Sequence, residues 1–203
     1  MTRDDGRRLL LVVAEDRGPG DLAGRALAAL ASTLEQRSVE YLVDLLGVFE
    51  SLPERVPVFE AAQAPARAAL LAVSFDRHRG AGFGACLGDG GCFLLQGAED
   101  RLPRRLNPRN RRLLALTVRE GRSLLQMGRP DSFGFQAIAG QVLVTTASGA
   151  AARRLAAGAS VHDLAARAWQ SAEPPDRDQQ GRDLDPATRL IHLANVTAAV
   201  TRL

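Results

Sequence analysis

The sequence predicts an α+β fold built in layers, with antiparallel strands in the sheets and the helices grouped apart from them. Between residues 69 and 96, short apolar runs alternate with glycine-rich turns, a pattern typical of antiparallel strands with tight connections. Two helical patterns, over residues 21–36 and 39–52, follow each other without a strand between them. A parallel sheet would need strictly alternating strands and helices, so these observations favour the layered antiparallel class.

The first strand is expected at residues 8–14 (RLLLVVA), a continuous apolar run that suits a strand buried on both faces. The segment EDRGPG at residues 15–20 can only be a turn. A helix then follows over residues 21–36, and Asp21 is its expected N-cap.

The second helix is expected over residues 39–52, because Leu42, Leu45, Leu46 and Phe49 form an apolar stripe and Pro53 and Pro57 follow. From residue 69 the pattern changes to that of strands. The expected strands cover residues 69–75, 82–87, 92–96, 113–118 and 142–146.

The last part of the chain is expected to contain a helix over residues 151–170, which Gly158 would divide, and a final strand over residues 195–201. The polar segment 171–185 between them is interpreted as a loop. In a hairpin around the Gly-Asp-Gly-Gly turn, Cys86 and Cys92 would face each other. No CxxC spacing or nearby histidine indicates a metal site, so both are interpreted as buried free thiols.

The length of 203 residues and the hydrophobic content of 46% predict a single domain over residues 1–203 with one sizeable core. No run approaches the roughly 20 apolar residues of a membrane helix, and the N-terminal apolar run stops at Glu15. We therefore expect a cytoplasmic protein without a membrane partner.

The net charge is only +3, and all 26 basic residues are arginines. The densest basic segment, residues 101–112 (RLPRRLNPRNRR), contains no aromatic residue that could stack on a base. We therefore expect no nucleic-acid partner. The segment is interpreted as a solvated loop first and as an anion-binding surface second.

Four stretches, in order, carry a resemblance to a known family. They are VVAEDRGPGDLAGRALAALASTLEQ (12–36), FGACLGDGGCFLLQG (83–97), GQVLVTTASGAAARRLAAG (140–158) and LANVTAAVTRL (193–203). Together they resemble the PPM-type metal-dependent protein serine/threonine phosphatases. That family has an Asp-Gly-x-Gly-Gly turn after a strand, a Gly-Asp-Ser hairpin, a Ser-Asp-Gly strand end and a final Asp-Asn-x-Thr strand. The resemblance implies an α-β-β-α sandwich of two antiparallel sheets flanked by helices.

The family's aspartates hold two Mg²⁺ or Mn²⁺ ions, which lower the pKa of a bridging water and direct it at a phosphate ester. By this resemblance, Asp16 takes the first aspartate position and Gly20 the last glycine of that turn. Arg17 stands where the family uses a glycine carbonyl. Asp89, after Gly88, matches the aspartate of the Gly-Asp-Ser hairpin.

Two further metal positions are degenerate. Ser148, before Gly149, stands in place of the Ser-Asp-Gly aspartate, and Ala194, before Asn195, stands in place of the last one. Neither side chain can chelate a dication. The resemblance leaves Asp16 and Asp89 as residual metal ligands and assigns no catalytic residue, while both aspartates are also ordinary turn residues.

Three hypotheses follow. The favoured one is a pseudophosphatase that has lost its dinuclear centre, needs no cofactor, and binds a phosphoprotein, kinase or regulator. The alternative is a divergent, weakly active phosphatase that uses Mg²⁺ or Mn²⁺ with Asp16, Asp89 and a third acid such as Glu15, Asp21 or Asp185. The third is an enzyme that binds a nucleotide or adenosyl compound at the helix N-terminus after EDRGPG.

Overall fold

The computed structural model describes residues 1–17, 20–56, 65–96, 103–119, 122–158 and 198–203. Its helices are α1 (Leu22–Gln36), α2 (Leu42–Glu50), α3 (Leu52–Arg55) and α4 (Gly149–Ala156). Its strands are β1 (Thr2–Asp4), β2 (Arg8–Asp16), β3 (Ala66–Asp76), β4 (Ala81–Leu87), β5 (Gly91–Leu95), β6 (Arg104–Arg105), β7 (Leu114–Arg119), β8 (Arg122–Met127), β9 (Asp131–Gln136), β10 (Val142–Thr146) and β11 (Ala198–Arg202).

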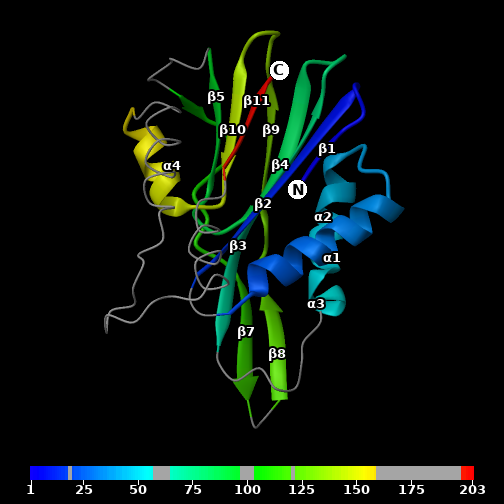
Figure 1. Cartoon of the computed structure of the whole chain (residues 1–203), viewed down its shortest axis with the longest axis vertical. Helices are drawn as coiled ribbons and strands as arrows, with labels where there is room; N and C mark the ends of the chain where they lie inside the picture. The colour runs from blue at the N-terminus through cyan, green and yellow to red at the C-terminus, as the bar shows by residue number, and fades with distance from the viewer. Residues whose placement is uncertain (18–19, 57–64, 97–102, 120–121, 159–197) are drawn as a thin grey trace, which may run out of the picture.

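The strands form two antiparallel sheets (Figure 1). The first sheet has the order β1-β2-β3-β4-β9, and β7 pairs with the start of β3 and carries β8 as the outer strand of a hairpin. The second sheet has the order β11-β10-β5-β6. The chain passes from the first sheet to the second through the three residues between Leu87 and Gly91.

Alternation along β2 shows why the two sheets stack. Leu10, Val12 and Ala14 belong to a core cluster shared with α1, α2 and α3, whereas the odd-numbered residues of the strand face a second cluster between the sheets. A fully apolar strand thus buries both faces, as its sequence predicts. The helices α1, α2 and α3 cover the outer face of the first sheet (Figure 1).

The second sheet alternates in the same way. Cys92, Leu94 and Leu143 join the cluster between the sheets, whereas Phe93 and Val144 pack outward with α4. The order of layers is therefore helices, sheet, sheet, helix, which confirms the predicted α-β-β-α sandwich. No helix within the described ranges is both long and apolar enough to cross a bilayer.

The structure corrects one predicted strand pairing. Residues 92–96 were expected to continue a meander with 82–87, but β5 pairs with β10 and β6 and lies in the other sheet from β4. Cys86 and Cys92 therefore do not face each other across a hairpin. Both thiols are free and buried, as predicted.

Several boundaries also differ from the sequence expectations. The helix over 39–52 ends at Glu50, and Pro53 lies in the first turn of α3 instead of ending a helix. The strands β1, β6, β8 and β9 were not predicted. Helix α4 begins at Gly149 and ends before Gly158, and most of the predicted helix 151–170 and the loop 171–185 lie outside the described residues.

Candidate functional site

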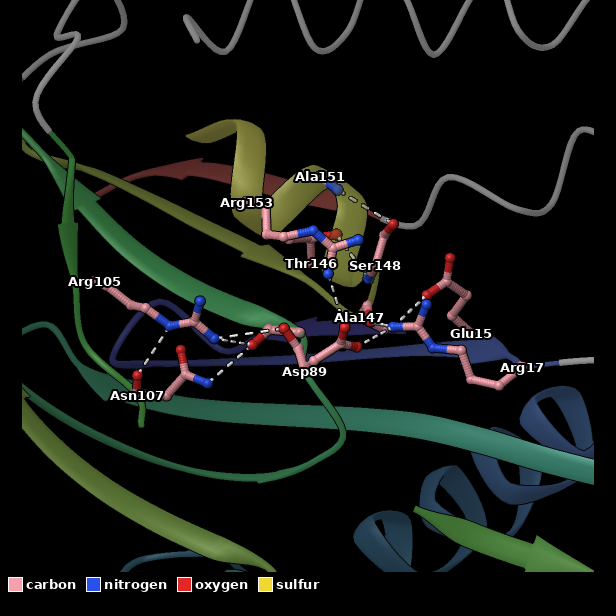
Figure 2. Close-up of polar contacts among 11 residues, drawn as sticks. Glu15, Arg17, Asp89, Arg105, Asn107, Thr146, Ala147, Ser148, Ala151 and Arg153 are labelled. Atoms are coloured by element: carbon pink, nitrogen blue, oxygen red, sulfur yellow. Dashed lines mark hydrogen bonds and ion pairs between the residues drawn. The ribbon is translucent and has the colours of Figure 1, made fainter. Parts of the chain in front are cut away.

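Three chain segments meet at one edge of the sandwich. They are the end of β2 with Glu15, Asp16 and Arg17, the β4–β5 turn with Asp89, and the β10–α4 junction with Ser148 (Figure 2). These segments are far apart in sequence: Arg17 contacts Asp89, which lies 72 residues further along the chain, and Ala147, which lies 130 residues further along. The two stacked sheets bring them together.

The β4–β5 turn needs its glycines for the close approach of the two sheets. Gly88 has φ +99°, in the region that favours glycine, and a Cβ there would lie 2.7 Å from the Cβ of Ala69. A Cβ on Gly90 would lie 2.5 Å from the carbonyl oxygen of Thr146, which is the last residue of β10. The Gly-Asp-Gly-Gly sequence therefore marks the place where the chain passes from the first sheet to the second.

Asp89 projects from this turn towards two arginines and the start of α4. Its Oδ1 lies 2.5 Å from Nη2 of Arg17, and its Oδ2 lies 3.3 Å from Nη1 of Arg153. The carboxylate is also packed so closely over Gly149, the first residue of α4, that a Cβ at this position would overlap it. A negative charge is favoured at a helix N-terminus, so Asp89 has three sources of stabilisation.

Arg17 occupies the centre of the site. Its Nη2 lies 3.0 Å from Oε2 of Glu15, pairs with Asp89, and donates to the carbonyl oxygen of Ala147 at 2.9 Å (Figure 2). One guanidinium nitrogen thus has oxygen partners from all three segments. The positive charge between the carboxylates belongs to the chain itself.

Glu15 is the second carboxylate of the site. Burial raises the pKa of its side chain, although the charge of Arg17 and a hydrogen bond with Ser148 oppose that shift. The nearby Asp89 and Asp16 charges raise its pKa further. Glu15 was named from the sequence only as one of several third acids, because its position in the turn did not match the family motif.

Asp16 points away from this cluster. Its Oδ1 accepts a hydrogen bond from the backbone N–H of Ala23 at 2.8 Å, in the first turn of α1. Burial raises the pKa of Asp16, and the Ala23 hydrogen bond opposes the shift. Asp21, the expected N-cap, makes no side-chain capping bond. The structure therefore brings Glu15, rather than Asp16, beside Asp89.

Ser148 caps α4. Its Oγ accepts from the backbone N–H of Ala151 at 3.4 Å, and its own N–H donates to Oγ1 of Thr146 at 3.1 Å. Ser148 therefore lies at the site, between Glu15 and α4. Gly20 has φ +111°, whereas Ala194 and Asn195 lie outside the described residues.

Two residues next to the site, Asn107 and Arg105, were not identified from the sequence. Asn107 is buried, and its side chain accepts from the N–H of Cys92 and donates to the carbonyl oxygen of Gly90. Arg105 donates to the same Gly90 oxygen at 2.6 Å and lies 5.6 Å above the ring of Phe93. This part of the basic segment was interpreted as a solvated loop, yet it is fixed to the β4–β5 turn. The only sequence feature that could have indicated this role is an Asn-Pro pair, Asn107 and Pro108, among the arginines.

The described residues of the site do not fit a pair of dications. Within the part of the chain that the structure describes, no group of three or more His, Cys, Asp or Glu side chains could hold a metal ion. Mg²⁺ and Mn²⁺ require several oxygen ligands around the ion. Between the carboxylates of Glu15 and Asp89, the available position is taken by Nη2 of Arg17.

No protein-family model and no curated protein sequence matches the chain. Solved structures do match. The SiaA-PP2C domain of Pseudomonas aeruginosa has a TM-score of 0.57 at 16% identity, over 100% of this chain and 79% of that one. The S. agalactiae serine/threonine phosphatase has a TM-score of 0.53 at 13% identity, over 100% of this chain and 91% of that one. A structure described as the bacterial stressosome, "a modular system that has been adapted to control secondary messenger signaling", has a TM-score of 0.53 at 14% identity, over 98% and 87%.

At these identities the likeness establishes the fold. The chain has the fold of the PPM-type, or PP2C, phosphatases, and the resemblance read from its four motifs is confirmed at that level.

Proposed function

We propose that this phosphatase-like domain acts by binding a protein partner and does not hydrolyse phosphate esters by the two-metal route. The observation that carries the proposal is the position of Arg17, whose Nη2 contacts Glu15, Asp89 and the Ala147 carbonyl together. A tethered guanidinium there supplies positive charge to the site without any ion from solution.

The chemistry follows from the difference between the two kinds of cation. A bound dication lowers the pKa of its water and creates a nucleophile, whereas a guanidinium has no open coordination position and activates no water. A dication entering between Glu15 and Asp89 would have to displace Arg17 and would be repelled by it. The site therefore retains the capacity to hold an anion and lacks a source of nucleophile.

The class of partner is inferred from the comparisons. One protein of this fold is described as part of the stressosome, a modular signalling system. We infer that this chain likewise contacts another protein in a regulatory assembly, such as a phosphoprotein, a kinase or a regulator.

The proposal is tested by titrating the protein with Mn²⁺ in a calorimeter and by measuring release of phosphate from p-nitrophenyl phosphate and a phosphopeptide in excess Mn²⁺. We expect no saturable Mn²⁺ binding and no release above that of the Asp89→Ala variant. Release that exceeds the background and is lost in both Glu15→Gln and Asp89→Ala would overturn the proposal in favour of a divergent phosphatase.

A gain-of-binding variant tests the reason for the proposal. Ser148→Asp with Ala194→Asp restores carboxylates at the degenerate positions, and Arg17→Gly removes the competing cation. We expect the triple variant to bind Mn²⁺ at least about tenfold more tightly than the double variant. The reason is that repulsion between the Arg17 guanidinium and the metal ion weakens binding by about a kcal/mol or more. Equal affinities would show that Arg17 does not exclude the metal.

The third hypothesis, a nucleotide or adenosyl site at the start of α1, has less support. The Asp16 carboxylate already accepts from the N–H of Ala23 in that first helical turn. An anionic ligand placed there would meet this negative charge.

A further inference from the structure

An arginine-rich cavity of about 450 Å³ opens beside the site. Among the described residues, its charged lining consists of one carboxylate, Asp89, and six arginines, which are Arg17, Arg67, Arg105, Arg109, Arg111 and Arg153. The cationic side chains therefore outnumber the anionic one by five. We name this cavity the arginine pocket.

Within the described residues, four of the six arginines form no ion pair, and three of these four also form no side-chain hydrogen bond. Arg17 and Arg153 share Asp89, and Arg105 donates to backbone oxygens of the β4–β5 turn. Within the described residues, no ion pair or side-chain hydrogen bond involves Arg67, Arg109 or Arg111. Concentrating like charges without partners costs free energy, which a bound anion would recover.

The backbone that carries these arginines is held in place. Between Arg109 and Arg111, the buried Asn110 side chain donates to the carbonyl oxygen of Cys86 at 3.3 Å. On the other wall, the carbonyl oxygen of Arg67 accepts from the N–H of Arg17 at 2.7 Å. The pocket is thus formed by segments anchored to β4 and β2, so binding need not bring these backbone segments together.

We propose that the arginine pocket binds the phosphoryl group of a phosphorylated side chain on the partner protein, through guanidinium groups and without a metal ion. The proposal rests on the proposed function of the domain as a binding module. Arginine forms paired, charge-assisted hydrogen bonds to phosphate oxygens, and several such forks can surround a dianion.

The lining favours a phosphorylated side chain over a nucleotide. Among the residues that the structure describes, no aromatic side chain lines the pocket, so a base would find no ring there to stack on. The excess of five positive charges also exceeds what a single carboxylate would balance. A phosphomonoester carries nearly two negative charges at neutral pH and offers three strong acceptor oxygens.

The test uses the full chain in EDTA and a short Gly/Ala peptide with a central phosphoserine, followed by calorimetry or NMR titration at millimolar peptide. The unmodified peptide, inorganic phosphate and AMP are the comparison probes. We expect the phosphopeptide to bind, more tightly than inorganic phosphate or AMP, and the unmodified peptide not to bind.

A matched pair of variants separates the pocket from general charge. Arg109→Gln with Arg111→Gln removes two exposed arginines from the pocket, and Arg104→Gln with Arg154→Gln removes two exposed arginines outside it. We expect the pocket variant to bind about tenfold more weakly or worse, since each hydrogen bond to a charged group contributes substantially. The outside variant should stay within about twofold of wild type, apart from screened long-range effects.

Equal weakening by both variants, tighter binding of AMP or inorganic phosphate, or no binding of the phosphopeptide would overturn the inference. Repeating the titration with Mn²⁺ while measuring free phosphate separates it from the proposed function. Binding without release supports both. Binding with Mn²⁺-dependent release would keep the inference and overturn the proposed function, whereas absence of both binding and release would overturn the inference alone.

Discussion

At the scale of single residues, three consecutive positions at the end of β2 have different roles. Glu15 and Arg17 face the β4–β5 turn, whereas Asp16 between them faces α1. The alternation of side chains along a strand explains this division, because neighbours point to opposite faces. A motif match by residue type selected Asp16, whereas the strand period places its two neighbours in the site.

The role of Asp16 predicts a structural effect without an effect on binding. Asp16→Ala removes the acceptor for the N–H of Ala23 and should lower the free energy of unfolding by about 1 kcal/mol, the usual contribution of a helix cap. Urea unfolding measures this loss. Asp21→Ala is the control, since Asp21 makes no capping bond and should change stability by less than about 0.5 kcal/mol. Comparable losses of stability in both variants would contradict the assignment of Asp16 as the residue that caps α1.

Glu15 predicts a pH dependence of stability. Because burial raises its pKa in the folded protein, the folded state holds a proton that the unfolded state has released, from the ordinary value of 4.5 upwards to the raised one. Stability from this group therefore falls as pH rises through that window. Glu15→Gln cannot titrate, so it should match wild type below pH 4.5 and be the more stable protein above the window.

Urea unfolding of both proteins across pH 4 to 8 checks this sign, with all other conditions held fixed. Asp16 has a pKa raised in the same direction, so wild-type and variant curves should both fall, and only the difference between them reports Glu15. A variant that loses stability at neutral pH would show that the Arg17 ion pair outweighs the burial of Glu15.

At the scale of elements, the β4–β5 connection determines how the sandwich is assembled. A glycine turn between two apolar runs predicts a hairpin from local sequence, and here the two runs enter different sheets. Strand existence was predictable because it depends on local apolar patterning. Strand pairing was not, because β5 finds its partner β10 about fifty residues further along the chain.

The close approach at this connection predicts opposite effects for two glycine substitutions. Gly90→Ala would bring a Cβ to 2.5 Å from the Thr146 carbonyl oxygen and should lower the free energy of unfolding by about 1–3 kcal/mol through overpacking. Gly47→Ala in α2 has no atom within 4 Å of its Cβ and should raise it by about 0.5–1 kcal/mol. Thermal unfolding of both variants distinguishes these outcomes. A Gly90→Ala variant as stable as wild type would contradict the close approach of the β4–β5 turn to Thr146.

At the scale of the whole molecule, the layers were predictable and the electrostatics of the site were not. The four ordered motifs predicted the sandwich, because turns and apolar strands depend on the residue pattern of short segments of the sequence. The arginine pocket gathers six arginines from four separate segments: Arg17, Arg67, Arg153 and three from the basic segment 101–112, namely Arg105, Arg109 and Arg111. The basic segment 101–112 is visible in the local sequence, but its meeting with Arg17, Arg67 and Arg153 is not, since that convergence is a property of the stacked sheets.

The cluster between the sheets should carry much of the stability. Leu143 is fully buried there, so Leu143→Ala should lower the free energy of unfolding by about 2–5 kcal/mol through lost burial and a cavity. Val43, which is 71% exposed on α2, is the control and should tolerate Ala within about 0.5 kcal/mol. Chemical denaturation followed by circular dichroism measures both, and a small loss for Leu143→Ala would argue against tight packing between the sheets.

The distance along the chain between the segments of the site has a consequence for the order of folding. The β3–β4 hairpin closes between Asp76 and Ala81, whereas the contacts of Arg17 span 72 and 130 positions. Closing long loops costs more entropy, so we expect local hairpins to form before the junction of the two sheets. During synthesis, a growing chain cannot complete this site until Ala147 has been added. The site is therefore completed only after the first sheet can already have begun to fold.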